Sequence, residues 1–419
     1  MLSNFDRNMG VIRRRWPSVA RELEAVKVAH VQWQDGPKDG TLVYKGIRMT
    51  GAVDRMADAR VQAGTVAAGS DVQWCFGIGL GELPRELIRR NRKTAVIVMN
   101  REFARASLEQ VYHADWLEHK KVNFGLAADI AASIRVPDNA PFTVVPMELR
   151  HCDPDAYPVR DAVCGAINSR FNYGIQYKAQ LTNDLAHWEA NKARMEGIDK
   201  PVPELFDTRK GCDAIVCASG PTLDDQLEWL HANRDGKLLI CLNSSLKPLR
   251  SAGIMPDYCV VIDSADSIAK GLDGLEVDSL AQCVLIYEPV VTPAFIESWP
   301  GERRFSVNNW LWSKGTVMHA AVDLAAKMGA ASITLLGVDL CHPRLKSHAK
   351  DAPDHYDVKT EIPAAMIPTI DGNGNETYTI PCHAMYHRHL ESYIKDHPQI
   401  RFYKRGREGV PVMGAAWME

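Results

Sequence analysis

Short apolar runs alternate with amphipathic stretches along most of the chain, which is the pattern of an α/β protein. Continuous apolar runs are typical of strands that are buried on both faces of a parallel sheet. Between residues 213 and 266 three such runs each end in a small polar group: Ala214–Cys217 leads to Ser219-Gly220-Pro221-Thr222, Leu238–Leu242 to Asn243, and Tyr258–Ile262 to Asp263. Because ligands of open parallel sheets bind beyond the carboxyl ends of the strands, this pattern predicts a nucleotide-sized pocket there.

The same alternation extends to both sides of this segment. Downstream we expect a helix over 316–327, a strand over 332–336 that delivers Gly337 and Asp339, a polar segment over 346–382, a helix over 383–395 and a last strand over 399–403. Upstream, a strand over 71–77 leads into the glycine turn Gly77-Ile-Gly-Leu-Gly81. Its spacing, GxGxG, differs from the dinucleotide fingerprint GxGxxG, so we interpret it as a Rossmann-like unit without assigning it a ligand.

A chain of 419 residues is too long for one ordinary hydrophobic core, which predicts two domains. We expect an N-terminal Rossmann-like domain over 1–165, a helical linker over 166–206 and a nucleotide-binding domain over 207–419. The predicted fold class is therefore α/β with two Rossmann-like domains.

Composition narrows the class of protein. The content of 46% apolar and 24% charged residues is that of a globular protein, and the net charge of −3 argues against nucleic acid as the main partner. No apolar run is long enough to span a bilayer, and the first residues lack a secretory pattern. The ten cysteines are scattered without a CxxC pair, as in reduced cytosolic proteins, so we expect a cytoplasmic location without disulfides or a cysteine zinc site.

The turn Ser219-Gly220-Pro221-Thr222 has two interpretations. Its glycine and the free N–H groups of a helix start favour a phosphate, whereas Thr222 with Asp225 also fits a capping box of an ordinary helix. Asn243 and Asp263 offer the donors and acceptors that a ribose and a pyrimidine edge require, although such residues also close turns. Together, the three strand ends favour a ligand.

Two later features add candidate chemistry. Ser313-Lys-Gly315-Thr opens another helix and could donate N–H groups to a phosphate, or simply cap that helix. His383 and His387 lie four residues apart and share a helix face, and a histidine beside a sugar pocket can take a proton from a hydroxyl. Ala384 excludes the metalloprotease motif HExxH. The second domain contains no Asp-x-Asp motif, so we expect no metal site.

The second domain resembles the motility accessory factor family of flagellin glycosyltransferases and, more distantly, the bacterial sialyltransferases that use CMP-activated sugars. The resemblance also reaches the wider hydroxymethylpterin-diphosphokinase-like superfamily. It rests on the order of several segments: Cys217-Ala-Ser-Gly-Pro-Thr-Leu223, Cys241-Leu-Asn-Ser-Ser245, Val261-Ile-Asp263, Ser313-Lys-Gly-Thr-Val-Met318, Ile333-Thr-Leu-Leu-Gly-Val-Asp-Leu340, Ser347-His-Ala349 and Gly406-Arg-Glu-Gly-Val-Pro-Val-Met-Gly414. It implies an open, mostly parallel sheet of the sialyltransferase-like GT-A variant type with a C-terminal flap.

The resemblance also implies roles for single residues. The nucleotide-binding set it implies is Ser219, Gly220, Pro221, Thr222, Asn243, Asp263, Ser313, Gly315, Gly337 and Asp339. Allowing a gap of one residue, His383 falls near the proposed general base of the sialyltransferases, and the gap leaves His387 as a rival. The phosphate-side tyrosines of those enzymes have no counterpart that the sequence locates.

The activity that follows from the resemblance is transfer of a nonulosonic (sialic-type) sugar from a CMP donor to a hydroxyl of a protein or glycan acceptor. The donor is a substrate and no cofactor is required, with Mg²⁺ and an oligomeric state left open. One alternative is a 6-hydroxymethyl-7,8-dihydropterin diphosphokinase, which would use ATP and Mg²⁺. Another is a nucleotide-binding assembly protein without catalytic activity.

Overall fold

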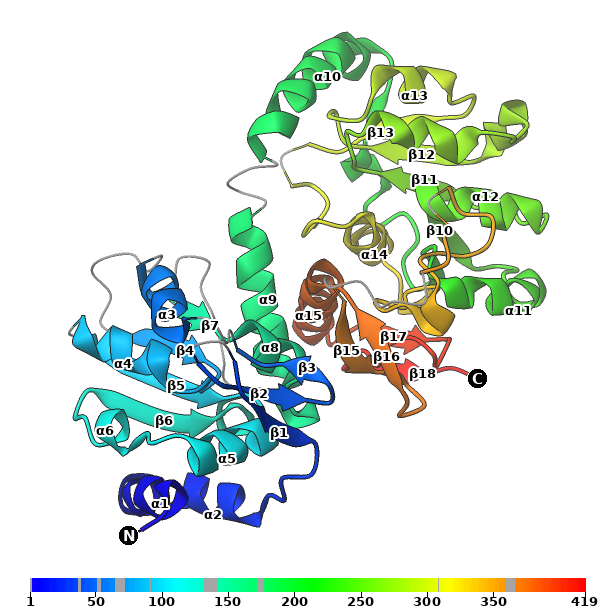
Figure 1. Ribbon diagram of the computed structural model, residues 1–419. Helices are drawn as coiled ribbons and strands as arrows, with labels where there is room; N and C mark the ends of the chain where they lie inside the picture. Colours follow the sequence, from blue (N-terminus) through cyan, green and yellow to red (C-terminus); the bar gives the residue numbers. More distant parts are fainter. Residues whose placement is uncertain are drawn as a thin grey trace. The chain divides into compact units, whose positions relative to one another are not determined.

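The computed structural model describes residues 2–36, 39–50, 54–64, 72–90, 92–131, 142–171, 177–307, 309–353, 355–358 and 366–419. The chain divides into two compact units, Met1–Ile167 and Asn168–Glu419. Each unit contains a parallel sheet with helices packed on it, which confirms the predicted α/β class with two Rossmann-like units (Figure 1). Most of the segment 166–206, predicted to be a linker, is counted with the second unit.

The first unit is built on the four-stranded sheet β6-β5-β4-β7, whose pairings are all parallel. A separate antiparallel sheet has the order β1-β2-β3. The elements, in chain order, are α1 (Asn4–Arg15), α2 (Pro17–Ala25), β1 (Val31–Gln34), β2 (Thr41–Tyr44), β3 (Ile47–Arg48), α3 (Arg55–Gly64), β4 (Gln73–Phe76), α4 (Glu82–Arg89), β5 (Thr94–Val98), α5 (Arg101–Gln110), α6 (Ala114–Leu117), β6 (Val122–Leu126), α7 (Ala127–Ile130), β7 (Phe142–Val144), α8 (Pro146–Arg150), η1 (Pro154–Ala156) and α9 (Tyr157–Phe171).

The second unit is built on one large sheet with the order β18-β17-β14-β9-β10-β11-β12-β13-β8, in which every neighbouring pair is parallel. A short antiparallel hairpin pairs β15 with β16. The elements are α10 (Tyr177–Gly197), β8 (Lys200–Pro201), η3 (Val202–Leu205), β9 (Asp213–Cys217), η4 (Pro221–Gln226), α11 (Leu227–Asn233), β10 (Leu238–Leu242), α12 (Asn243–Ser251), β11 (Tyr258–Val261), η5 (Asp266–Leu272), η6 (Val277–Gln282), β12 (Val284–Tyr287), α13 (Pro293–Ser298), β13 (Arg303–Phe305), α14 (Val317–Lys327), β14 (Ser332–Leu336), η7 (Pro343–Leu345), β15 (Ile367–Ile370), β16 (Glu376–Thr379), α15 (Pro381–Asp396), β17 (Arg401–Lys404) and β18 (Ala415–Trp417).

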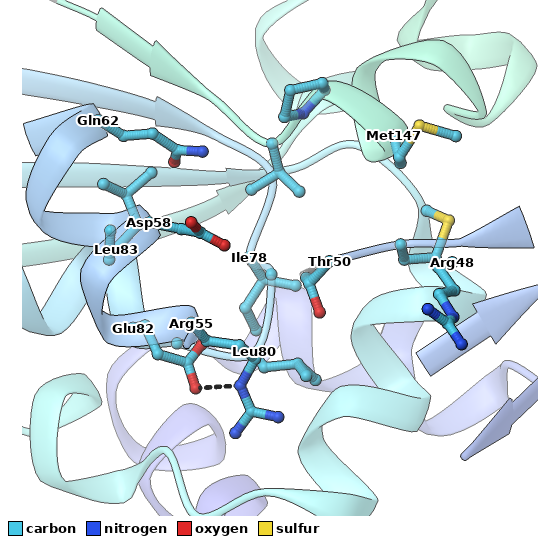
Figure 2. A pocket seen from close by; sticks show the side chains of 16 residues that line it. Arg48, Thr50, Arg55, Asp58, Gln62, Ile78, Leu80, Glu82, Leu83 and Met147 are labelled. Carbon is cyan, nitrogen blue, oxygen red and sulfur yellow. Dashed lines mark hydrogen bonds and ion pairs between the residues drawn. The ribbon is translucent and has the colours of Figure 1, made fainter. Parts of the chain in front are cut away.

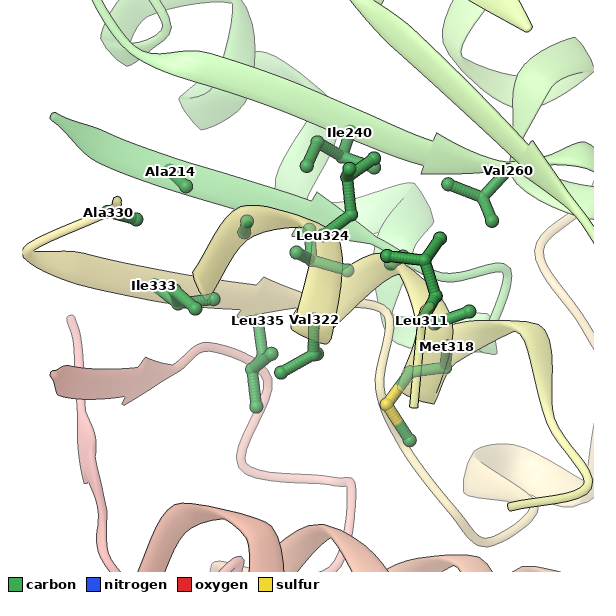
Figure 3. Packing of buried hydrophobic residues seen from close by; sticks show 14 of the residues in the cluster. Ala214, Ile240, Val260, Leu311, Met318, Val322, Leu324, Ala330, Ile333 and Leu335 are labelled. Carbon is green, nitrogen blue, oxygen red and sulfur yellow. The ribbon is translucent and has the colours of Figure 1, made fainter. Parts of the chain in front are cut away.

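Helix α14 forms the centre of one core layer of the second unit. Figure 3 shows Val322 and Leu324 of this helix among the inward side chains of the sheet, which include Ile240, Ile333 and Leu335. All five are almost completely buried, so the helix is apolar around most of its circumference rather than along one stripe. Burying one such side chain contributes roughly 1.5–3 kcal/mol. This layer fixes the strands whose carboxyl ends form the candidate site.

The opposite face of the same sheet explains how the chain uses cysteine. Cys217, Cys241, Cys259 and Cys283 are fully buried in the second core layer of this unit. Burial raises the pKa of the thiols of Cys217, Cys241 and Cys283. All four cysteines pack as small apolar side chains. All ten cysteines are free thiols. Among the described helices, none combines the length and the apolarity that a membrane crossing requires.

The segment predicted as a polar flap has more structure than its composition indicated. Residues 354 and 359–365 lie outside the described part, but β15 and β16 form a hairpin after them. Its turn is held by Asp371, whose Oδ1 accepts hydrogen bonds of 2.8 Å from the N–H groups of Asn373 and Asn375. The predicted last strand is confirmed as β17, whereas the short edge strand β18 was not predicted.

A buried histidine makes the first unit sensitive to acid. His113 is fully buried, its Nδ1 accepts a 3.0 Å hydrogen bond from the indole Nε1 of Trp116, and its Nε2 lies 3.2 Å from the carbonyl oxygen of Ser107. This arrangement requires the neutral ring with its proton on Nε2. Burial, reinforced by the charge of Arg85, lowers the pKa of His113 to about 3.

We therefore expect stability to fall as the pH drops below the ordinary histidine pKa of about 6.5, because the unfolded chain binds a proton that folded His113 does not. The expected loss is about 1.4 kcal/mol per pH unit for this residue, until the pH approaches the folded pKa. Urea denaturation at several pH values between 7.5 and 5.5 measures the loss. The variant His113→Phe should show a shallower decline than the wild type, and equal declines would contradict the assignment.

Candidate functional site

The sheet of the second unit reverses its strand order between β9 and β14, and four of the predicted nucleotide-binding residues meet at this point. The N–H of Gly220 donates a 2.8 Å hydrogen bond to the carbonyl oxygen of Gly337. Asp339 accepts hydrogen bonds from Thr222 through both the backbone N–H (2.8 Å) and the hydroxyl group. A Cβ on Gly220 would lie 2.4 Å from the Gly337 oxygen, so only glycine fits. We call Gly220, Thr222, Gly337 and Asp339 the β9–β14 contact.

These bonds change the interpretation of the glycine turn. The N–H groups of Gly220 and Thr222 are used in the β9–β14 contact, Pro221 has none, and the N–H of Leu223 donates to Gly220. The expected helix with Thr222 in a capping box is also wrong. The turn continues as the 3-10 helix η4, with Gly220 at its N-cap and no side-chain capping bond. The backbone of this turn therefore has no N–H group left over for a phosphate within Gly220–Leu223.

Buried charges surround this contact. Asp339 is fully enclosed, and its burial raises the pKa of the carboxyl group, while the positive charge of Lys404 and the bonds from Thr222 act in the opposite direction. Lys404 is equally buried and donates a 2.7 Å hydrogen bond to the carbonyl oxygen of Val338. Gly409 packs directly against both groups, because a Cβ at this position would clash with Lys404 Nζ and with Asp339. The predicted ligand residue Asp339 thus has a structural role.

The carboxyl ends of β9, β10 and β11 form the next part of this edge of the sheet. Ser219 follows β9 and its hydroxyl donates a 2.8 Å hydrogen bond to the hydroxyl of Ser244. Asn243 is the first residue of α12 and is half-buried, and no hydrogen bond to its side-chain amide occurs within the part of the chain that the structure describes. Asp263 follows β11, is exposed, and accepts a 3.0 Å hydrogen bond from the N–H of Ala265. Asn243 and Asp263 are therefore open to solvent at this edge, whereas Ser219 is buried beneath it.

Part of the polar segment after β14 flanks this edge. The N–H of Ala349 donates a 2.8 Å hydrogen bond to the carbonyl oxygen of Ser219, and the N–H of Lys350 donates to the carboxylate of Asp224. A Cβ on Gly271 would lie 3.4 Å from the carbonyl oxygen of Asn243 and 4.0 Å from Pro353. The segment that was predicted as a flap therefore touches the strand ends through residues 349–353.

The loop before α14 and the helix α15 form another side of the site. Gly315 has a left-handed backbone (φ +82°), and a Cβ there would lie 3.1 Å from the ring of Tyr386. The preceding loop is anchored because the N–H of Trp312 donates a 2.6 Å hydrogen bond to Asp323. Ser313, between these points, is half-buried. Gly315 thus lies next to Tyr386, and Ser313 lies in the same loop.

Tyr386 is a candidate residue that the sequence did not single out. Burial, with the nearby groups Cys382 and Asp263, raises the pKa of Tyr386 to about 12, so its hydroxyl keeps its proton at neutral pH. Among the described residues the hydroxyl has no hydrogen-bond partner, which leaves it free to donate to a ligand. The available signal was its position three residues after His383, on the same face of one helix.

The two rival histidines of α15 have different surroundings. The ring of His383 stacks on that of His342 with centroids 5.6 Å apart, and its Nδ1 is buried without a hydrogen-bond partner among the described residues. Burial, followed by the charges of His342 and His348, lowers the pKa of His383 to about 3, so the ring is neutral at pH 7. The Nε2 of His387 instead lies 2.7 Å from the carbonyl oxygen of Pro411 and 3.1 Å from Glu391. His387 therefore ties α15 to the C-terminal segment.

Metal ligands do not gather in the described residues, where no group of three or more His, Cys, Asp or Glu side chains has a metal-binding arrangement. The one Asp-x-Asp sequence lies in the first unit, where Arg101 contacts Asp153 at 2.9 Å and Asp155 at 2.8 Å. Asp155 of η1 and its N-cap residue Asp153 therefore neutralise Arg101, the first residue of α5. The only candidate motif of this kind is thus accounted for by an ion-pair network.

Comparison with known proteins found a family model that matches the central segment of the chain and a solved structure that is similar to the chain. Residues 189–344 match the family model described as 6-hydroxymethylpterin diphosphokinase MptE-like. The chain is also similar to a solved structure described as the MAf glycosyltransferase from Magnetospirillum magneticum AMB-1, with 15% identity, a TM-score of 0.47, and coverage of 99% of this chain and 74% of that one. No curated protein matches the chain. The predicted similarity to the hydroxymethylpterin-diphosphokinase-like superfamily is confirmed for the segment that contains every candidate strand end.

The β9–β14 contact yields a stability prediction. Replacing Asp339 by Asn removes the carboxylate that receives two bonds from Thr222 and that lies near the buried ammonium of Lys404. We expect the free energy of unfolding to fall by about 2–4 kcal/mol, because uncompensated buried charges and lost buried hydrogen bonds are costly. The matched control is Asp225→Asn in η4, whose ion pair with Arg344 is exposed and should change stability by less than about 1 kcal/mol. Equal effects of the two variants in urea denaturation would contradict the assignment.

Proposed function

We propose that this protein is a glycosyltransferase that moves a nonulosonic (sialic-type) sugar from a CMP donor to a hydroxyl of a protein or glycan acceptor, with a flagellin-like protein as one acceptor class. The proposal is supported best by three groups: the amide of Asn243 after β10, which has no hydrogen-bond partner among the described residues, and the phenol of Tyr386 and the neutral imidazole of His383, whose ring centroids lie 6.3 Å apart on α15. These three groups come from two distant segments. They supply the types of group that base recognition, leaving-group stabilisation and proton removal require.

The donor half of the reaction needs groups that recognise cytidine and stabilise one phosphate. The amide of Asn243 can donate and accept at once, as a pyrimidine edge requires. The leaving group of a CMP-sugar is a single phosphate, and positioned neutral donors can stabilise its developing charge. Because the N–H groups of the glycine turn are already used, we assign this role to the hydroxyls of Ser219, Ser244 and Tyr386.

The acceptor half needs a base that removes a proton from a hydroxyl. His383 is neutral and its buried Nδ1 has no hydrogen-bond partner in the described structure, so the ring has a lone pair available. A base is most effective when its pKa lies near the working pH. An anionic donor bound beside His342, His348 and His383 raises the pKa of these rings, since a negative charge stabilises the imidazolium form. In this proposal, donor binding raises the pKa of His383 toward the working pH, where a base is most effective.

The diphosphokinase alternative predicts a different ligand. The family model that matches residues 189–344 is described as 6-hydroxymethylpterin diphosphokinase MptE-like. A diphosphokinase activity would require ATP and Mg²⁺. The two functions differ in the nucleotide they bind and in their need for a divalent cation. Binding measurements with CMP and with ATP, each with and without Mg²⁺, therefore separate them.

Titration calorimetry with CMP tests the donor site. We expect binding without Mg²⁺ and a loss of roughly 1–3 kcal/mol, which is about 5–150-fold in affinity, when Asn243 is replaced by Ala. The control is Asn373→Ala, an exposed residue of the β15–β16 turn that should leave affinity unchanged. Unchanged binding by Asn243→Ala would remove this amide from the site. A preference for ATP with Mg²⁺ over CMP would instead favour the diphosphokinase.

Sugar transfer by variants of α15 tests the base. The variant His383→Ala should bind CMP within a few-fold of the wild type and lose about 10²–10⁴ in transfer rate, because the acceptor hydroxyl keeps its proton. His387→Ala is the matched control and should affect stability more than rate, given its contacts with Pro411 and Glu391. Normal transfer by the His383 variant would show that this histidine is not the base.

A further inference from the structure

The first unit contains a cavity of about 270 Å³ that the proposed transfer reaction does not use. Its walls are the segments Ile78–Leu83 after β4 and Val145–Met147 after β7, together with residues of β3, its following turn and α3 (Figure 2). The strand order β6-β5-β4-β7 reverses between β4 and β7. In open parallel sheets this reversal is where ligands bind, so the cavity lies at the position that topology favours.

The glycine turn beside this cavity cannot hold a phosphate in the usual way. A Cβ on Gly77 would lie 2.6 Å from the Cβ of Val145, and one on Gly81 would lie 2.6 Å from the Nδ1 of His113, so tight packing explains both glycines. The N–H of Gly79 donates a 2.6 Å hydrogen bond to Oε1 of Glu148. A carboxyl group of the protein thus occupies the place of an anionic ligand.

Glu148 is completely buried, and its second oxygen, Oε2, has no hydrogen-bond partner within the described residues. Burial raises the pKa of its carboxyl group to about 8, although the bonds from Gly79 and Ile78 act in the opposite direction. A bound phosphate would have to displace this group or lie against it. The turn therefore disfavours a phosphorylated ligand.

The polar groups that face the cavity include one uncommitted charge. Figure 2 shows the Asp58 carboxylate pointing from α3 toward the centre of the cavity, where Thr50 lies on the opposite side. No hydrogen bond to this carboxylate occurs within the described chain. The guanidinium of Arg55 is bound to Glu82 at 2.9 Å and to the carbonyl oxygen of Gly40. Arg48, an exposed residue of the same wall, donates a 3.0 Å hydrogen bond from its Nε to Gln34. The cavity therefore offers the exposed carboxylate of Asp58 as an acceptor of hydrogen bonds, with Arg48 as the second charged group that has solvent access.

The apolar part of the wall is made by Ile78, Leu80, Leu83 and Val145, which are all buried, and the polar part also includes Arg48, Gln62 and Glu82. A volume of about 270 Å³ lies at the lower limit of ligand cavities, which run from roughly 300 Å³ upward. It is too small for a dinucleotide, and its apolar walls suit a flat ring better than a polar chain. A carboxylate facing such walls matches a ring that carries hydroxyl groups.

We propose that this cavity binds a nucleoside, or a nucleoside derivative, that has no phosphate on its 5′ carbon. Asp58 accepts hydrogen bonds from the ribose hydroxyls, while Leu80, Leu83 and Val145 contact the base. The buried Glu148 carboxyl excludes 5′-phosphorylated forms by filling the glycine turn. This site is separate from the proposed CMP site, because every residue that forms it belongs to Met1–Ile167.

Calorimetry on the full chain tests the site with adenosine and guanosine and with their 5′-diphosphates as probes. We expect at least one nucleoside to bind with a dissociation constant of millimolar or better, and its diphosphate to bind at least tenfold more weakly. The variant Asp58→Asn should weaken nucleoside binding at least tenfold without changing the melting temperature of the free protein. The matched control Asp129→Asn, exposed on α7, should bind as the wild type does.

Three results would overturn this proposal: no binding of either nucleoside, a diphosphate that binds as tightly as its nucleoside, or unchanged binding by Asp58→Asn. Repeating the titrations with the Asn243→Ala variant shows which of the two units produces the measured heat of nucleoside binding. Nucleoside binding that survives in this background but is lost in Asp58→Asn supports the cavity. Binding lost only in Asn243→Ala would place the nucleoside at the other unit and contradict it.

Discussion

The hydrogen bonds of Asp339 to Thr222 are the constraint on which the candidate site depends. They join the carboxyl ends of β9 and β14 at the reversal of strand order, in a place closed to water. A buried carboxylate is costly unless it is paired and bonded, and here Thr222 and the nearby Lys404 meet that need. Because this position is filled, the accessible groups lie further along the edge, over β10 and β11.

Both units use the same physical solution at their glycine turns. In the first unit the carboxyl group of Glu148 accepts a hydrogen bond from Gly79, and in the second Asp339 accepts one from Thr222. Each carboxyl group is buried and bonded to N–H groups that a phosphate would otherwise use. In both cases the turn that looks like an anion site in sequence is occupied from within the protein, and ligand recognition falls to neighbouring side chains.

At the sheet edge of the second unit, neutral rings lie close to the exposed carboxylate of Asp263. The buried rings of His342 and His383 lie stacked, and burial lowers the pKa of both. Tyr386 keeps its proton for the same reason, since burial disfavours the charged phenolate and so raises the pKa of the hydroxyl.

The sequence by itself determined the α/β class, the strands β9, β10, β11 and β14, and the polar residues at their ends, because apolar period and strand-end position are local properties. It also placed Asn243 and Asp263 at one edge, whereas His383 entered only through the family resemblance. Only the tertiary structure decided which of these groups are free. Thr222 and Asp339 are 117 residues apart, Tyr386 meets Gly315 only through packing, and Glu148 reaches the glycine turn of Gly79 from another strand end. A residue's hydrogen-bond partners depend on contacts between distant segments, and no local pattern contains them.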